Sequence, residues 1–283
     1  MSSATFSIRD YDLSGTLSSG QAFRWRFVDG GWNGVIASRW VRLRGDEFSI
    51  YAQTATPVAD WNWLTDYLQI NLDLVAVLKT FPDDDPMRAS VLACRGLRLL
   101  RQEPWECLAS FILSSTKQIV QIQQIVAMLC EHFGESIPAL PPYGPAYSFP
   151  SAERIARATE AELRDCKMGF RAPYLLKTAR TIASGKLDLE RLREVPVEIA
   201  RSELMQLPGV GKKIADCVLL FAYGFPTAFP VDVWVMKALR ELYFPKRRPS
   251  SKRLHRFSEM HFGPNAGYAQ QYLFHYMRTK RIQ

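Results

Sequence analysis

The residues with the clearest chemical potential lie in one short segment, LPGVGKKIADCV, at positions 207–218. Its two glycines, Gly209 and Gly211, favour a tight hairpin, because glycine adopts positive φ and lets a ligand approach the backbone closely. Apolar residues recur with helical spacing over 198–206 and 212–223, so the segment predicts a helix-hairpin-helix unit. Unpaired amides at the start of the second helix can bind a phosphate oxygen. An ordinary turn between two helices is the alternative.

Two side chains near this hairpin could take part in covalent chemistry. Lys213 stands at the start of the second helix beside apolar Ile214, where partial desolvation and the helix N-terminus favour a nucleophilic amine. Asp232 follows nineteen residues later and fits the N-cap of the next helix. A cap holds the carboxylate in place, so Asp232 could also stabilise a cation that forms nearby. The competing role for Lys213 is a solvated phosphate contact, which suits its neighbour Lys212 better.

Two regions of different secondary structure must position these residues. Alternating apolar and polar residues near the N-terminus, interrupted by glycine turns, predict an antiparallel meander with one buried face. Its strands are expected near residues 23–27, 32–36, 40–43 and 48–51. Helical spacing dominates after the proline-bounded, aspartate-rich break at 82–86. The expected fold class is α+β, with an antiparallel β domain and short helices over 1–93 and a helical domain over 94–283.

The composition describes an ordered protein with a packed core. The chain has 283 residues, of which 47% are hydrophobic, and this excludes disordered and collagen-like classes. Neither a bilayer-spanning apolar run nor a signal-peptide pattern is present. We therefore expect an intracellular protein without a membrane partner, in the nucleoid or cytoplasm of a bacterium or the nucleus of a eukaryote.

Charge is distributed unevenly between the two regions. Residues 1–93 carry 8 basic and 11 acidic side chains, a net charge of −3, whereas residues 94–283 carry 28 and 17, a net charge of +11. A basic second region suggests a polyanionic partner, most often nucleic acid, although a solvated basic surface explains the charge equally well. The stretch 246–256 and the tail residues Arg278, Lys280 and Arg281 are open to the same two interpretations.

The cysteines and histidines lack the spacing of a metal site. No two cysteines have the close spacing of a zinc or iron–sulfur site. We expect reduced, mostly buried thiols and no metal or other cofactor. The five cysteines are Cys94, Cys107, Cys130, Cys166 and Cys217.

Several motifs together resemble the 8-oxoguanine DNA glycosylase family of helix-hairpin-helix base-excision enzymes. They cover roughly residues 14–278 in the family's order. The motifs are SGQAFRWR at 19–26, LLRQEPWEC at 99–107, SFI at 110–112, GFRA at 169–172, the hairpin at 207–218, PVD at 230–232, GP at 263–264, AQ at 269–270 and Phe274. The agreement of many spaced motifs makes the resemblance specific.

The resemblance implies a mechanism for Lys213 and Asp232. In this family the lysine attacks C1′ of the deoxyribose, expels the damaged base, and forms a Schiff base that permits β-elimination of the 3′ phosphate. Superfamily members that only remove the base lack this lysine, so Lys213 implies a bifunctional glycosylase and AP lyase. Asp232 would stabilise cationic character on the sugar and help to position Lys213.

The resemblance also implies a pocket for a base that has been extruded from the duplex. Gly20 would accept a hydrogen bond from the protonated N7 of 8-oxoguanine through its carbonyl, and Gln270 would bind the Watson–Crick edge. Phe274 and Cys217 would sandwich the base. Cys217 lies four residues after Lys213, which places both on one helix face. For Cys217, an ordinary core position is an equally good interpretation.

Other residues are expected to contact the DNA around the lesion. The hairpin would grip the backbone without reading bases, and Arg171 would contact the orphaned cytosine. Phe170 stands where the best-known members have a tyrosine wedge, and an aromatic ring there would still push between bases. The hairpin residues are Gly209, Val210, Gly211 and Lys212.

Three positions depart from the eukaryotic pattern. Thr116 stands where those members have a gap-filling asparagine, Gln121 where they have a second cytosine-reading arginine, and Trp234 where they have histidine. Two of three contacts to the cytosine are therefore altered, which predicts a relaxed preference for the opposite base.

The function expected is removal of 8-oxoguanine from duplex DNA in base excision repair by a monomeric enzyme. One alternative is an alkylpurine glycosylase of the same superfamily, whose pocket is more aromatic and whose typical members lack the lysine. The other is a non-catalytic DNA-binding module that uses only the hairpin, against which the pair of Lys213 and Asp232 argues.

Overall fold

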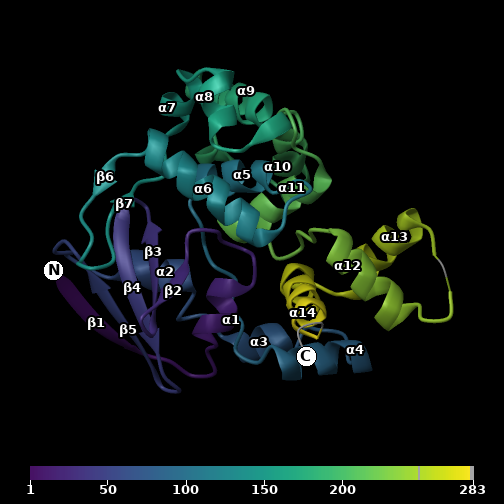
Figure 1. Ribbon diagram of the computed structural model, residues 1–283. Coiled ribbons are helices and arrows are strands. Elements are labelled where there is room, and N and C mark those ends of the chain that lie inside the picture. Colours follow the sequence, from purple (N-terminus) through teal and green to yellow (C-terminus); the bar gives the residue numbers. More distant parts are fainter. Residues whose placement is uncertain (248, 281–283) are drawn as a thin grey trace.

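The computed structural model describes residues 1–247 and 249–280 (Figure 1). Arg248 and Arg281, two of the basic residues discussed above, lie outside these ranges. An antiparallel five-stranded sheet near the N-terminus is followed by a mainly helical region, so the α+β prediction is confirmed. In Figure 1 the sheet lies on one side, and α14 lies between α1 and α12.

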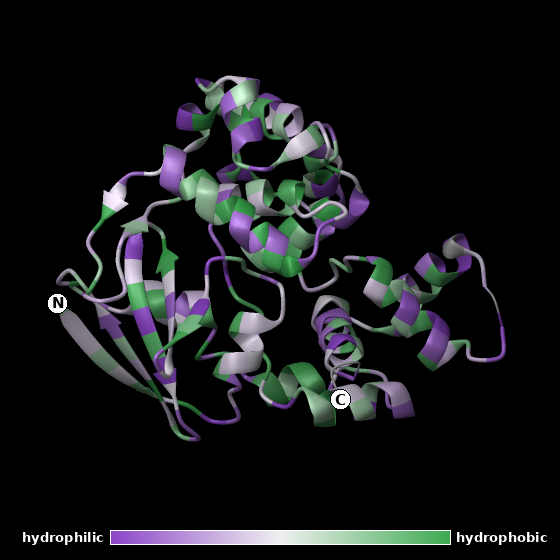
Figure 2. Cartoon of the chain, viewed as in Figure 1, coloured by the Kyte–Doolittle hydropathy of each residue, from purple (hydrophilic) through white to green (hydrophobic). Residues whose placement is uncertain are grey.

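The sheet has the strand order β1-β5-β4-β3-β2. Its strands are β1 (Ser2–Ser7), β2 (Arg26–Val28), β3 (Gly31–Ile36), β4 (Arg39–Gly45) and β5 (Ser49–Thr54). Hydrophobic and hydrophilic residues alternate along these strands (Figure 2). Ile50 and Ala52 of β5 and Leu43 of β4 are buried against Leu17 and Leu64, which gives the sheet the apolar face that its alternation predicts.

Strand β4 is an exception to the prediction of a single buried face. Trp40, Val41, Arg42 and Leu43 are all buried, so both of its faces are covered. Tyr143, from the proline-rich loop after α6, stacks on Trp40 at a centroid distance of 6.2 Å and lies under the Arg42 guanidinium at 4.2 Å.

The strand predicted near 23–27 is confirmed only for Arg26 and Phe27, because β2 begins at Arg26. The residues just before Arg26 pack into two different hydrophobic cores and do not pair with a neighbouring strand. Phe23 packs edge-to-face on Phe111 of the helical core, whereas the Trp25 indole donates to the Tyr67 hydroxyl beside the sheet at 2.9 Å. Strand β1 was not predicted, since its sequence SSATFS has few apolar residues.

Helices account for most of the remaining chain. Those before residue 134 are α1 (Leu13–Ser18), α2 (Asn62–Leu68), α3 (Leu74–Leu78), α4 (Asp85–Ala93), α5 (Pro104–Leu113) and α6 (Ile119–Phe133). A two-stranded ribbon, β6 (Ser136–Ile137) and β7 (Ala146–Tyr147), precedes α7 (Ala152–Ala156), α8 (Glu160–Asp165), η1 (Gly169–Arg171), α9 (Ala172–Ala183), η2 (Glu190–Arg193) and α10 (Val197–Leu204). The last elements are α11 (Lys212–Val218), η3 (Leu219–Tyr223), α12 (Val233–Ala238), η4 (Leu239–Tyr243), α13 (Ser251–His261) and α14 (Ala266–Thr279).

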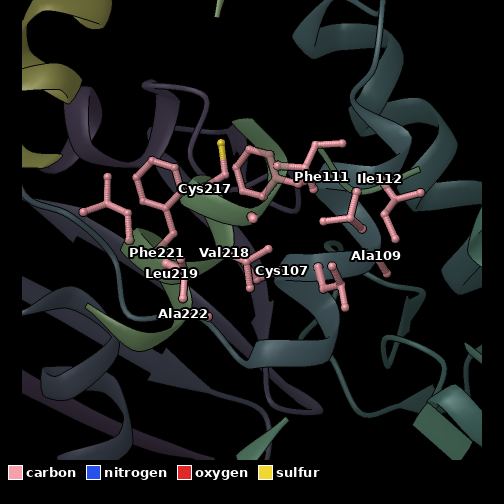
Figure 3. Close-up of a cluster of buried hydrophobic side chains, with 14 of the residues drawn as sticks. Cys107, Ala109, Phe111, Ile112, Cys217, Val218, Leu219, Phe221 and Ala222 are labelled. Atoms are coloured by element: carbon pink, nitrogen blue, oxygen red, sulfur yellow. The ribbon is translucent and has the colours of Figure 1, made fainter. Parts of the chain in front are cut away.

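The continuous helix predicted at 212–223 ends in a π-helical turn, η3, and the helix that follows Asp232 ends in another, η4. The first of them packs on α5, and the rings of Phe111 and Phe221 stack at 5.6 Å. Figure 3 shows Cys217, Val218 and Phe221 from α11 and η3 facing Phe111 and Cys107 from α5. All five cysteines are buried and free, as the sequence predicted.

The helical core also includes residues that precede the predicted boundary at 93/94. Leu74 and Met87 belong to the same buried cluster as α5 and α11, and α4 packs on α14. The division into 1–93 and 94–283 stays a prediction.

A buried ion pair joins the two helices of the hairpin unit. Arg201 of α10 donates from Nε to the Asp216 carboxylate of α11 at 2.7 Å, and the Asp216 side chain is 2% exposed. We expect Asp216→Ala to lower the free energy of unfolding by about 3 kcal/mol, because it leaves the guanidinium without its buried partner. Urea denaturation measures the change.

The matched control is Glu160→Ala, which breaks the half-exposed pair with Arg164 within α8. Its expected cost is about 0.5 kcal/mol or less. A loss below about 1 kcal/mol for Asp216→Ala would show that the buried pair does not hold the hairpin together.

Candidate active site

Of the two glycines in the hairpin, only Gly209 has a positive φ. Gly209 has φ +79°, and a Cβ there would lie 2.9 Å from the Tyr174 ring, so the position requires glycine on two grounds. The expectation of positive φ at Gly211 is wrong, because φ is −93°. Gly211 is the extended N-cap of α11, a conformation open to most residues, and its carbonyl accepts from the Ala215 amide at 3.0 Å. Val210 is buried beneath the turn.

Lys213 points away from solvent toward α5. Its side chain is half-buried, and Nζ donates to the Ser114 hydroxyl at 3.4 Å and lies 5.2 Å from the centroid of the Phe111 ring. Cys217 lies beside it on the same helix face, as predicted. Burial raises the pKa of the Cys217 thiol to about 12, and the nearby Lys213 opposes this only in part. The thiol is therefore neutral and packs as an apolar group.

Asp232 caps α12, so the predicted N-cap is confirmed. Its Oδ1 accepts from the amides of Trp234 at 2.9 Å and Val235 at 2.8 Å. Burial raises the pKa of the carboxyl, whereas the two amides and the charges of Lys213 and Arg278 favour the carboxylate. The second oxygen, Oδ2, has no hydrogen-bond partner among the described residues. A fixed carboxylate therefore shares its surroundings with a lysine and an arginine.

Gly20 approaches this group from the N-terminal region. Its φ is +81°, and a Cβ would lie 2.5 Å from Cδ1 of Ile119 and 3.3 Å from Nη1 of Arg278. Glycine is thus required both for the backbone conformation and for the close approach of these two side chains.

The neighbouring Gln21 explains how the Gly20 loop is held, a role that the sequence reasoning missed. This side chain is fully buried, and Nε2 donates to the carbonyl oxygens of Thr16 and Arg98 at 3.0 and 2.8 Å. Its Oε1 accepts from the Leu100 amide at 2.7 Å. A buried amide satisfied on both sides ties the loop to the start of the helical region.

One face of α14 completes the group. Gln270, Phe274 and Arg278 recur every four residues and therefore share a face. Gln270 is 3% exposed, yet its Oε1 has no hydrogen-bond partner among the described residues. The Arg278 guanidinium lies 5.4 Å from the centroid of the Phe274 ring. The sequence left Arg278 among the ambiguous basic tail residues, although its spacing from Phe274 was the available signal.

A second group joins the residues predicted to surround the lesion. Phe170 is 52% exposed and contacts Tyr174 edge-to-face, and Tyr174 in turn lies against Gly209. The Arg171 guanidinium lies 4.2 Å from the centroid of the Phe170 ring. An exposed aromatic ring is therefore supported by neighbours that connect it to the hairpin.

Arg171 is itself almost fully buried. Its Nε donates to the Ser115 carbonyl at 2.8 Å, and its Nη2 donates to the Thr116 hydroxyl at 2.6 Å. Thr116 is exposed and has φ +57°, a strained conformation for a β-branched residue. A contact between Arg171 and DNA would require the guanidinium to leave these partners.

The remaining predicted residues lie around the two groups. Lys212 is exposed and pairs with Glu259 of α13 at 2.8 Å. Gln121 is exposed and accepts from the Gln118 amide at 3.0 Å, which caps α6. Trp234 is partly buried against the helical core, 6.0 Å from the Lys237 ammonium.

Across residues 1–247 and 249–280, no group of three or more His, Cys, Asp or Glu side chains is placed to hold a metal ion. Within the same residues, no helix has both the length and the apolar character to cross a membrane.

The chain matches two family models over most of its length. The model for the 8-oxoguanine DNA glycosylase N-terminal domain matches residues 3–108. The model for the HhH-GPD superfamily of base excision DNA repair proteins matches residues 109–262.

Individual proteins agree with the family models. The chain is 30% identical over 304 aligned residues to a probable N-glycosylase/DNA lyase of Methanothermobacter thermautotrophicus, covering 97% of this chain and 96% of that protein. A crystal structure of the Clostridium acetobutylicum 8-oxoguanine glycosylase/lyase with double-stranded DNA superposes with a TM-score of 0.90 at 30% identity, covering 98% of both chains. A Bacillus subtilis DNA-3-methyladenine glycosylase is 28% identical over 71% of this chain and 68% of that protein.

Proposed function

Because the chain belongs to the 8-oxoguanine DNA glycosylase family of the helix-hairpin-helix base-excision superfamily, we propose that it removes 8-oxoguanine from duplex DNA and nicks the strand through Lys213. The observation that carries the proposal is the arrangement of the site. The half-buried Lys213 amine and the charge of Arg278 on α14 both act on the capped Asp232 carboxylate, and Arg278 lies beside Gly20. Alkylpurine removal without a lysine nucleophile does not use this arrangement.

The chemistry begins with attack of the Lys213 amine on C1′ of the deoxyribose. The N-glycosidic bond breaks, and its electron pair leaves with the base, which takes up a proton. Asp232 stabilises the positive charge that develops on the sugar, and its two cap hydrogen bonds keep it in place without reorganisation. The sugar ring opens as Lys213 forms the imine, a proton leaves C2′, and the 3′ phosphate departs by β-elimination.

The extruded base would be held by residues from three distant parts of the chain. The Gly20 carbonyl accepts from N7–H, the Gln270 amide binds the Watson–Crick edge, and the Phe274 ring and Cys217 thiol cover the two faces. The unpaired Oε1 of Gln270 supports this role, since a buried acceptor without a partner is costly unless a ligand supplies one. The neutral thiol of Cys217 suits apolar contact with a base.

Duplex DNA would lie along the hairpin and the Phe170 group. The backbone at Gly209–Gly211 and the Lys212 ammonium would contact phosphates, although Lys212 must first leave Glu259. The exposed Phe170 ring would enter the base stack beside Thr116. We propose that one monomer suffices, because every residue in the scheme comes from one chain.

Borohydride trapping tests the function and separates it from its alternatives. Wild-type protein is incubated with duplexes containing 8-oxoguanine, 3-methyladenine or no lesion, and covalent adducts and released bases are measured. We expect an adduct and free base from 8-oxoguanine alone. Release of 3-methyladenine without an adduct would favour an alkylpurine glycosylase, and binding without any release would favour a non-catalytic module.

The opposite-base preference is expected to be weak. Thr116 and Gln121 replace residues whose base contacts are worth about 1–3 kcal/mol each, and the Gln121 Oε1 is already used to cap α6. We expect single-turnover excision from duplexes with C, A, G or T opposite 8-oxoguanine to vary by about tenfold or less. A preference for C on the order of a hundredfold would contradict this.

A further inference from the structure

Arg278 occupies an unusual environment for a basic residue in the last turn of α14, a helix whose residues are mostly buried. Lysine and arginine heads near helix ends normally extend into water. Here Nη1 is buried and has no hydrogen-bond partner among the described residues, and the guanidinium forms no ion pair with any of them. A buried charged donor without an acceptor is expensive, so the position calls for an acceptor that the chain itself does not provide.

The surroundings of Arg278 indicate where that acceptor would lie. Nη1 is 3.3 Å from the place where a Cβ on Gly20 would sit, and the guanidinium carbon is 5.4 Å from the centroid of the Phe274 ring. Both residues belong to the base pocket of the proposed function. The negative charge of Asp232 also acts on Arg278, without a direct contact. The donor therefore faces the pocket.

The face of α14 formed by Gln270, Phe274 and Arg278 presents an acceptor, a ring and a donor, which together are complementary to a planar ligand. Gln270 carries an unpaired buried acceptor, Phe274 provides a ring, and Arg278 carries an unpaired buried donor at the far end. An oxidised purine offers N–H donors on its Watson–Crick edge, a flat ring system, and a carbonyl oxygen on its imidazole edge. Unmodified guanine has C8–H in place of that carbonyl, which leaves N7 as the acceptor of its imidazole edge.

We propose that Arg278 is a specificity-determining residue that donates a hydrogen bond from Nη1 to the C8 carbonyl oxygen of the extruded base. The inference rests on the proposed function and deepens it. Gly20 and Arg278 would read adjacent atoms of the lesion, N7–H and C8=O, so that guanine loses both contacts. When the N-glycosidic bond breaks, the departing base carries negative charge that is delocalised onto this oxygen, and the guanidinium stabilises it.

The test compares two reactions of the same enzyme. Arg278→Met keeps an unbranched apolar stem and removes the charge and the guanidinium donors, and Arg278→Lys restores the charge without the guanidinium geometry. We expect Arg278→Met to slow single-turnover release of 8-oxoguanine by about ten- to hundredfold, with a smaller loss for Arg278→Lys. Cleavage of a duplex that already contains an abasic site should stay within about threefold of wild type, because no base is present.

The control variant is Lys280→Met, which changes a basic residue two positions further along the chain. The ammonium of Lys280 is exposed and lies over the Tyr276 ring. Both reactions should be unchanged in this variant. An equal loss of release and abasic-site cleavage in Arg278→Met would overturn the inference, because Arg278 would then act through Lys213, Asp232 or folding. Unchanged or faster release would overturn it too, since Arg278 would merely fill the place that the base enters. Wild-type protein that leaves 8-oxoguanine intact would instead refute the proposed function, and this inference with it, before any variant is compared.

Discussion

Replacing Lys213 with glutamine is expected to abolish the borohydride-trapped adduct and to slow 8-oxoguanine release by about a thousandfold or more. Glutamine keeps most of the side-chain volume but cannot form an imine. Nζ of Lys213 is the amine that lies between Ser114, Phe111 and the Asp232 pocket, so no other described amine replaces it. Trapping and base release are measured on one duplex under single-turnover conditions.

Lys212→Gln is the matched control, because it changes the adjacent lysine of the same helix. Lys212 is exposed and pairs with Glu259 instead of facing the pocket. We expect this variant to weaken DNA binding a fewfold and to keep the trapped adduct. Base release that persists in Lys213→Gln at the wild-type rate would refute the assignment of the nucleophile.

Asp232→Asn is expected to slow base release by about a hundred- to thousandfold, comparable to the loss of one preorganised charge in other active sites. Asparagine is as good an N-cap as aspartate, so α12 should keep its first turn. The variant therefore separates the electrostatic role of the carboxylate from its structural role. Single-turnover rates and a thermal melt are measured together.

The pH dependence gives a second signature of Asp232. Burial raises the pKa of its carboxyl, so the active carboxylate is lost on acidification at a higher pH than for an ordinary aspartate. The same raised pKa means that the folded protein binds this proton more tightly than the unfolded chain. The corresponding stability is present at low pH and lost as pH rises through the folded-state pKa. We expect Asp232→Asn to lack both effects and to be at least as stable as wild type at neutral pH.

Asp73→Asn provides the control for this comparison. Asp73 also caps a short helix, accepting from the Ala76 amide at 3.0 Å, but it is exposed and far from the site. Its substitution should leave base release unchanged. An acid limb that persists in Asp232→Asn would assign the titration to another group.

Features decided by nearby residues could be predicted from the sequence. The hairpin follows from glycines and helical periodicity within about ten residues, and the cap of α12 from Asp232 and the two amides that follow it. The pairing of Lys213 with Cys217 on one face follows from helix geometry. Strands β3, β4 and β5 follow from alternation and glycine turns. In each case the interacting groups are close in the chain, so residue type and spacing are sufficient.

Features decided by contacts between distant residues could not be predicted. The chain at 22–25 is not a strand, because Phe23 and Trp25 enter two different cores. Gln21 holds the Gly20 loop through hydrogen bonds to partners near residue 100. Arg171 donates its hydrogen bonds to Ser115 and Thr116. The environment of a polar side chain depends on which groups folding brings beside it, and spacing along the chain does not contain that information.

Arg278 shows the distinction most directly. By sequence alone it is one basic residue among several near the C-terminus, and only its spacing from Phe274 separates it from Lys280. Local periodicity determines only that it shares a face with Gln270 and Phe274. Packing of α14 beside the Gly20 loop and the start of α12 then buries Nη1 next to Gly20 without an acceptor among the described residues. The sequence by itself thus predicted the candidate reactive pair and determined the hairpin and the family, because their signals are local. The tertiary structure alone decided which further side chains surround this candidate site, because burial and desolvation arise only when distant segments meet.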